Sequence, residues 1–224
     1  MLIVKGKHVA LLIIAILVAD QILKIYIKTN YYLGEEHNML GSWFRLHFVE
    51  NKGMAWGWEF GDGFGKIALT LFRLVAVIAG TFYLRHIIQK QMHKGFVVCA
   101  SLIYAGAAGN LIDSMFYGMI FENSDYYVQN VANFTAFGKG YASFLHGKVV
   151  DMLYFPIIQI EKMPAWMPFL GGQPFEFFSP VFNLADAAIS TGVIALFIWQ
   201  KKWMPDNKPA AATSEPASTE TDNS

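Results

Sequence analysis

Four apolar stretches, each about as long as a membrane-spanning helix, constrain the fold of this chain more than any other feature. They occupy residues 8–28, 66–88, 95–117 and 181–203. The hydrocarbon core of a bilayer is roughly 30 Å thick, which requires about 20 residues of helix. The first stretch contains Asp20 and Lys24, the second Arg73 and the fourth Asp186. Because charges inside membrane spans are costly and usually functional, we predict four transmembrane helices and treat these residues as candidate site residues.

The composition agrees with a membrane protein. Only 15% of the residues are charged, compared with roughly 25% in soluble domains, and 54% are apolar. The formal net charge of zero argues against a nucleic-acid-binding protein, which would be basic. Cys99 is the single cysteine, which excludes a disulfide framework. The first stretch could also be read as a signal peptide, but Asp20-Gln21 makes a poor cleavage site, so we interpret it as a span.

The charges beside the spans predict the orientation. Basic residues flank one end of every span: Lys5, Lys7, Arg85, Lys90, Lys94, Lys201 and Lys202. By the positive-inside rule, both termini lie in the cytoplasm and the loops 29–65 and 118–180 lie outside. The alternation from Trp43 to Val49 predicts a strand in the first loop. We therefore predict one membrane domain over residues 1–204, followed by a tail, 205–224, whose composition indicates disorder.

With this topology, the rare intramembrane charges gather at one depth. Asp20 lies in the outer half of the first span, and Arg73 lies in the outer half of the second. Asp113 ends the third span, Asp186 begins the fourth, and Asp151 belongs to the second outer loop. We therefore expect an acidic site near the outer face of the membrane.

Paired carboxylates at such a site have a specific chemistry. Two acids in a partly dry site cannot both ionise cheaply, so one keeps its proton. The ionised acid can then take a proton from water while the neutral acid polarises a carbonyl group. Asn110 stands three residues before Asp113, and Asn183 three residues before Asp186, so we expect each pair to share a helix face. Small residues in 104–109 should let another helix approach closely.

Simpler interpretations apply to several of these residues. Asp20 with Lys24 is typical of a structural ion pair, and Asp113 could be structural or catalytic. Cys99 is expected to pack, and the six histidines to lie at the surface. No Ser/His/Asp order, metal-binding His-Glu-x-x-His or phosphate-binding glycine motif is present, so we expect neither cofactor nor metal. The residues alone leave open a protease, a proton-coupled carrier and a non-catalytic scaffold.

Five short blocks resemble a known family. They are Asp20-Gln21-x-x-Lys24, Asn51-Lys-Gly53-Met-Ala55-Trp56-Gly57, Gly109-Asn110-Leu-Ile-Asp113, Gly147-Lys-Val-Val-Asp151 and Phe182-Asn183-Leu-Ala185-Asp186. Each block alone is weak, but their order on four spans is similar to bacterial lipoprotein signal peptidase (signal peptidase II). The resemblance covers about residues 7–202.

The resemblance implies a mainly helical membrane protein of four spans with an extracytoplasmic β-sheet cradle and an interfacial helix. It implies an aspartyl endopeptidase of the bacterial inner membrane that removes signal peptides from prolipoproteins carrying a diacylglyceryl-modified cysteine. Its partners would be these precursors and membrane lipid, without nucleic acid. By this resemblance Asp151 and Asp186 form the catalytic pair. The supporting positions are Asp20, Lys24, Asn51, Gly53, Asn110, Asp113, Asn183 and Ala185.

The chain departs from the family pattern in two places. The family usually carries Arg directly after the Asp of Asn-Leu-Ile-Asp, where this chain has Ser114, and Arg73 is a candidate substitute. The segments from Asp113 to Asp151 and from Asp151 to Asp186 are also long for the family. We interpret them as insertions in the outer loop that form a lid or additional strands.

Overall fold

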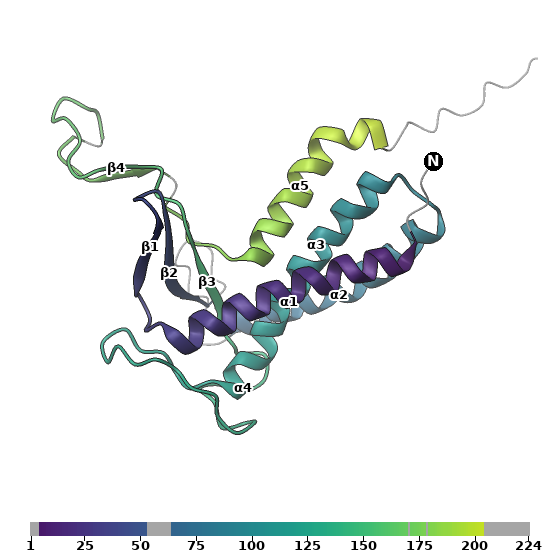
Figure 1. Cartoon of the computed structure of the whole chain (residues 1–224), viewed down its shortest axis with the longest axis horizontal. Coiled ribbons are helices and arrows are strands. Elements are labelled where there is room, and N and C mark those ends of the chain that lie inside the picture. The colour runs from purple at the N-terminus through teal and green to yellow at the C-terminus, as the bar shows by residue number, and fades with distance from the viewer. Residues whose placement is uncertain (1–4, 53–63, 170, 178, 204–224) are drawn as a thin grey trace, which may run out of the picture.

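Four long helices dominate the computed structural model, which describes residues 5–52, 64–169, 171–177 and 179–203 (Figure 1). They are α1 (Gly6–Asn30), α2 (Phe64–Gln89), α3 (Lys94–Ile112) and α5 (Leu184–Trp203). A π-helical turn, η2 (Asp113–Tyr117), and the short α4 (Gly118–Ile120) continue α3. All four long helices are apolar and long enough to cross a membrane, which confirms the four predicted spans.

The bundle is organised around α3. Half of its membrane-spanning window is buried, compared with 17%, 11% and 17% in α1, α2 and α5. Gly106 and Gly109 allow this central position. A Cβ atom on Gly106 would collide with the backbone oxygen of Ala185, and one on Gly109 would lie 2.8 Å from Asp20 Oδ2. The predicted close approach at 104–109 is therefore confirmed, because the small residues admit both α5 and α1.

An antiparallel sheet lies at one end of the bundle (Figure 1). Its order is β1 (Glu36–Leu40), β2 (Phe44–Asn51) and β3 (Val149–Tyr154), and β2 confirms the strand predicted from alternation. A separate hairpin of β4 (Ile158–Ile160) and β5 (Phe175–Phe177) projects beyond it. Between the long helices, the helical pieces among the described residues are η2 and α4, so the interfacial helix remains a prediction.

The long segment between α4 and β3 packs against the hydrophobic core beside the sheet. Phe121 is fully buried beside Tyr117 and Phe48, and the Tyr141 hydroxyl accepts a hydrogen bond from Lys148 N at 2.7 Å. In the described part of this segment, pairing is limited to isolated bridges such as Phe121 with Phe134. The strands that the structure has in the loop 118–180 are β3, β4 and β5, and all three follow the segment 121–148.

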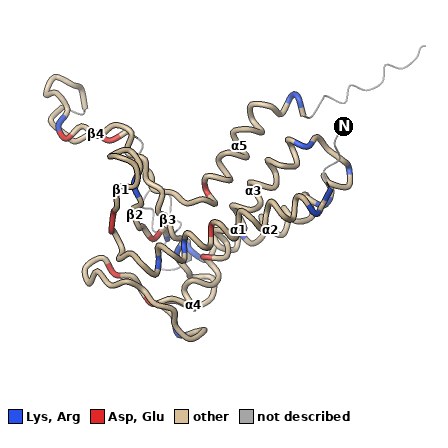
Figure 2. The backbone as a smooth tube through the Cα atoms, viewed as in Figure 1, with Lys and Arg blue, Asp and Glu red and all other residues tan. Residues whose placement is uncertain are grey.

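Charges are distributed unequally along the bundle. The coloured charges at the end where α1 begins and α5 ends are Lys and Arg, whereas toward the sheet Asp and Glu lie among further Lys and Arg (Figure 2). Cys99 is buried as expected. His93 does more than occupy the surface, because its Nδ1 accepts a hydrogen bond from Gly95 N and caps α3. Gly53, Trp56 and the predicted disordered tail fall outside the described residues.

Candidate active site

Backbone pairing between β3 and the segment before α5 brings Asp151 and Asp186 to the same place. Asp151 lies on β3 opposite Val49 of β2. Two residues later, Leu153 pairs with Phe182, with N–H···O distances of 2.7 and 3.0 Å. Since Phe182 lies two residues before the start of α5, this pairing fixes the first turn of the helix beside β3.

Asn183 contacts both aspartates. Its Nδ2 donates to Asp151 Oδ1 at 2.6 Å, while its Oδ1 accepts from the backbone N–H of Asp186 at 2.9 Å. The backbone N–H of Asn183 in turn donates to Asp186 Oδ2 at 3.3 Å. The expectation that Asn183 and Asp186 share a helix face is therefore wrong in detail. Asn183 precedes the helix and forms a reciprocal capping box with Asp186, because the first-turn N–H groups need acceptors.

Asn110 supports Asp186 from α3. Its Nδ2 donates to Asp186 Oδ1 at 2.8 Å, and its Oδ1 accepts from Lys24 Nζ at 2.9 Å and from Asn183 Nδ2 at 3.1 Å. These partners leave one sensible orientation for the Asn110 amide, because the lysine can only donate. The Lys24 ammonium polarises the amide, which strengthens the hydrogen bond from Asn110 Nδ2 to the Asp186 carboxylate.

Lys24 lies at the centre of a fully buried ion cluster. Its Nζ is 2.9 Å from Asp20 Oδ2 and 2.8 Å from Asp113 Oδ2, and each of the three side chains is at most 1% exposed. The predicted Asp20–Lys24 pair is confirmed. Asp20 also accepts from Ala185 N at 3.0 Å, and Asp113 accepts from Val150 N at 3.4 Å. The cluster thus connects α1 and α3 to the segments that carry both Asp186 and Asp151.

The two central aspartates lie in different surroundings. Asp151 is only 2% exposed, whereas Asp186 is half-buried. Burial, together with the negative charge of Asp186, raises the pKa of Asp151 to about 7, although hydrogen bonds from Asn51 and Asn183 and the charge of Lys24 oppose this rise. Asp151 can therefore hold a proton near neutral pH, while Asp186 accepts hydrogen bonds from Asn110 Nδ2 and from the Asn183 backbone N–H.

The structure also places the remaining candidates. Asn51 contacts Asp151 from the end of β2, and Gly53 lies outside the described residues. Arg73 of α2 reaches η2, where its Nη1 donates to Ser114 Oγ at 3.0 Å. Arg73, the candidate substitute, therefore contacts Ser114, which occupies the position where the family pattern has an Arg.

Two residues of the site, Gln21 and Lys28, were not predicted from the sequence to have a role there. Gln21 donates to Asp113 Oδ1 at 2.8 Å and accepts from the Tyr117 hydroxyl at 3.1 Å. Lys28, which is fully buried, forms an ion pair with Glu50 and donates to Ser124 Oγ at 2.8 Å. A signal for Lys28 was available, because it follows Lys24 by one helical turn within a span, and an intramembrane lysine requires a partner.

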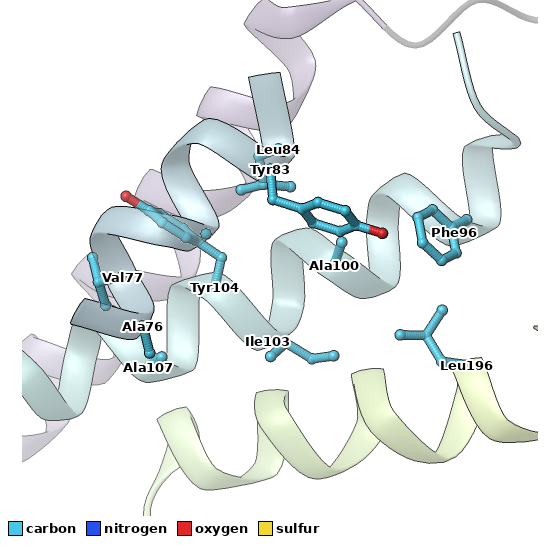
Figure 3. Close-up of a pocket in the computed structure, with 11 residues that line it drawn as sticks. Ala76, Val77, Tyr83, Leu84, Phe96, Ala100, Ile103, Tyr104, Ala107 and Leu196 are labelled. Carbon is cyan, nitrogen blue, oxygen red and sulfur yellow. The ribbon is translucent and has the colours of Figure 1, made fainter. Parts of the chain in front are cut away.

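An apolar cavity of about 370 Å³ lies between α2, α3 and α5 (Figure 3). Its lining includes Ala76 and Val77, one turn after Arg73, and Ala107, one turn before Asn110. Leu196 of α5 faces it from the other side. The cavity therefore begins about one helical turn from Arg73 and Asn110 and extends away from them along the bundle.

Comparison of the sequence with known protein families shows which family the chain resembles. The sequence model of the family described as "Signal peptidase (SPase) II" matches residues 12–201. The chain is 47% identical over 195 residues to the lipoprotein signal peptidase of Porphyromonas gingivalis, covering 87% of this chain and 83% of that protein. It is 35% identical over 201 residues to the lipoprotein signal peptidase of Amoebophilus asiaticus, covering 88% and 78%.

Solved structures show the same fold. Two chains described as a "bacterial membrane enzyme structure by the in meso method" superpose with a TM-score of 0.56. One is 23% identical, covering 91% of this chain and 93% of that one, and the other is 24% identical, covering 88% and 94%. The four-helix arrangement with its small sheets is therefore one that a bacterial membrane enzyme adopts.

Proposed function

We propose, from the premise that this chain belongs to the signal peptidase II family, that it cleaves prolipoproteins with Asp151, Asp186 and one water molecule. Membership makes it a protease of the lipoprotein signal peptidase class. The observation that carries the catalytic assignment is Asn183, which hydrogen-bonds to both carboxylates and so holds them around one small space.

The assignment of roles follows from the two environments. Asp186 accepts hydrogen bonds from Asn110 and from the Asn183 backbone, which suits a carboxylate that removes a proton from water. Asp151, whose pKa burial raises to about 7, keeps its proton and polarises the scissile carbonyl oxygen through a hydrogen bond. The water oxygen then bonds to the carbonyl carbon and forms a tetrahedral intermediate. When the C–N bond breaks, the proton held by Asp186 passes to the leaving nitrogen.

The apolar cavity between α2, α3 and α5 supports a lipid-bearing substrate. Its lining is almost entirely hydrocarbon, and its upper end lies one helical turn from Arg73 and Asn110. Apolar parts of a diacylglyceryl-modified precursor would fit there, while the scissile amide reaches the aspartates. We infer that the site opens at the outer face of the bacterial inner membrane, with both termini in the cytoplasm, because the described charges at the other end are basic and the acidic residues lie toward the site (Figure 2).

The test is cleavage by purified protein in lipid. We expect it to release the signal peptide from a precursor whose cysteine carries diacylglycerol, and to act far more slowly on the same precursor without lipid. Equal cleavage of both precursors would contradict the lipid requirement, and cleavage of neither would contradict the function. Cleavage in ¹⁸O-labelled water should place one label in the carboxyl terminus of the released peptide, because water is the nucleophile.

A further inference from the structure

Arg73 is a charged residue inside a membrane span whose charge is not balanced by a direct ion pair. It is half-buried on α2. Among the described residues, no carboxylate lies within ion-pairing distance of its guanidinium, and its hydrogen-bond partner is Ser114. Placing a guanidinium in a bilayer is costly, and such residues usually serve a function. This cost makes Arg73 the strongest candidate for a role that the dyad alone does not explain.

Ser114 connects this guanidinium to Asn110. The Ser114 hydroxyl is fully buried, accepts from Arg73 Nη1 at 3.0 Å, and donates to the backbone oxygen of Asn110 at 2.9 Å. Asn110 is also the residue that supports Asp186.

Among the described residues, Ser114 is the hydrogen-bond partner of the guanidinium, so the other N–H groups can bind a substrate. Arginine has five N–H donors, and one of them serves Ser114. Ala76 and Val77, one helical turn further along α2, line the apolar cavity that would receive the apolar part of the substrate. A peptide carbonyl that leaves this cavity toward the dyad would pass Arg73, and a carbonyl oxygen is the acceptor that an arginine fork requires.

We propose that Arg73 is a further catalytic residue, whose guanidinium binds the scissile carbonyl oxygen and stabilises the negative charge that develops on it, and that Ser114 is its positioning residue. This inference rests on the proposed function. In the family pattern an Arg stands at the position of Ser114; here the guanidinium reaches that position from α2 instead. A preorganised cation at a developing oxyanion accelerates the reaction because the charge interaction strengthens only as the carbonyl is attacked.

The experiment exchanges the two side chains. Arg73→Ser should lower kcat by about 10²- to 10³-fold, as the loss of one oxyanion donor does. Ser114→Arg should also lower kcat, because it places a second guanidinium in a fully buried position. The double exchange, Arg73→Ser with Ser114→Arg, restores a single guanidinium at the same place and should recover at least about tenfold of the kcat lost in Arg73→Ser. Arg85→Ser, an exposed arginine at the far end of α2, is the matched control and should keep the wild-type rate.

Each result decides the matter. Arg73→Ser with a kcat within about threefold of wild type would overturn the inference, as would a well-folded double exchange that recovers nothing. If Arg73→Ser unfolds, Arg73→Lys decides: it should melt like wild type yet lose kcat by at least about tenfold, because ammonium lacks the planar fork. A fully active Arg73→Lys would overturn the inference.

A binding measurement separates this inference from the proposed function. In an Asp186→Asn background, which cannot turn over, Arg73→Ser should weaken the binding of an intact diacylglyceryl precursor peptide by about tenfold, whereas Arg85→Ser should not. If the wild type cleaves nothing but this difference in binding is present, the proposed function fails and the contact stands. If the wild type cleaves and binding is unchanged in both variants, Arg73 does not touch the substrate.

Discussion

At the scale of single residues, Lys24 compensates two buried carboxylates, those of Asp20 and Asp113. Removing one partner of a buried ion pair leaves uncompensated charge, which typically costs about 3–5 kcal/mol. We therefore expect Lys24→Met to lower the melting temperature of the purified protein sharply in a thermal scan. Lys90→Met, on an exposed turn at the opposite end of the bundle, is the control and should melt like wild type. Equal melting of the two variants would show that the cluster contributes little to stability.

Asp151 should make stability depend on pH. Its pKa is raised from 3.8 to about 7, so the folded protein retains a proton that the unfolded chain releases. The stabilisation is complete below pH 3.8 and is lost as pH rises through about 7. Asp151→Asn removes this titration and keeps an oxygen that can accept from Asn183.

We therefore expect the melting temperature of Asp151→Asn, relative to wild type, to increase between pH 5 and pH 8. The corresponding difference in unfolding free energy should be on the order of a few kcal/mol at most. Glu161→Gln, an exposed substitution on the hairpin, should show no such trend. A constant difference across this pH range would mean that burial does not hold the proton on Asp151.

At the scale of elements, the contact between α3 and α5 positions Asp186. A Cβ atom on Gly106 would collide with the Ala185 backbone and lie 2.7 Å from Ile189 Cγ1. Gly106→Ala should push α5 away from α3 and weaken the hydrogen bond from Asn110 to Asp186. Since small displacements of catalytic groups can cost about 10²-fold, we expect a large loss in kcat/KM and a lower melting temperature. Gly6→Ala, where a Cβ meets nothing within 4 Å, should change neither quantity, and an unaffected Gly106→Ala would contradict this account.

Local patterns predicted some elements and missed others for a physical reason. The strand β2 was predictable because one face packs on the core and its residues alternate. The strand β3 was not, because Val149–Tyr154 is buried on both faces and shows no alternation. Its pairing with β2 and Phe182 depends on residues far apart in the chain, which no local pattern records. The same limit applies to the capping role of Asn183, which depends on where α5 begins.

At the scale of the whole molecule, the apolar stretches and the sparse charges predicted most of the architecture. The four spans are confirmed, and Asp20, Asp113, Asp151 and Asp186 gather in one hydrogen-bonded network, as the topology implied. The packing of the long segment after α4 could not be predicted, because its irregular backbone is held by individual buried side chains such as Phe121 and by the Lys28–Glu50 pair. The predicted membrane orientation follows only from the charge distribution (Figure 2).

The central claim is that Asp151 and Asp186 together perform the cleavage. The most direct measurement is kcat for a diacylglyceryl-modified precursor with wild type, Asp151→Asn and Asp186→Asn, each shown to melt as a folded protein. We predict that each substitution lowers kcat by at least about 10³-fold, because one removes the proton donor and the other the base. Asp20→Asn should lower the rate without abolishing it, because Asp20 holds the backbone of α5 and contacts neither carboxylate. A rate within about tenfold of wild type in either dyad variant would contradict the account.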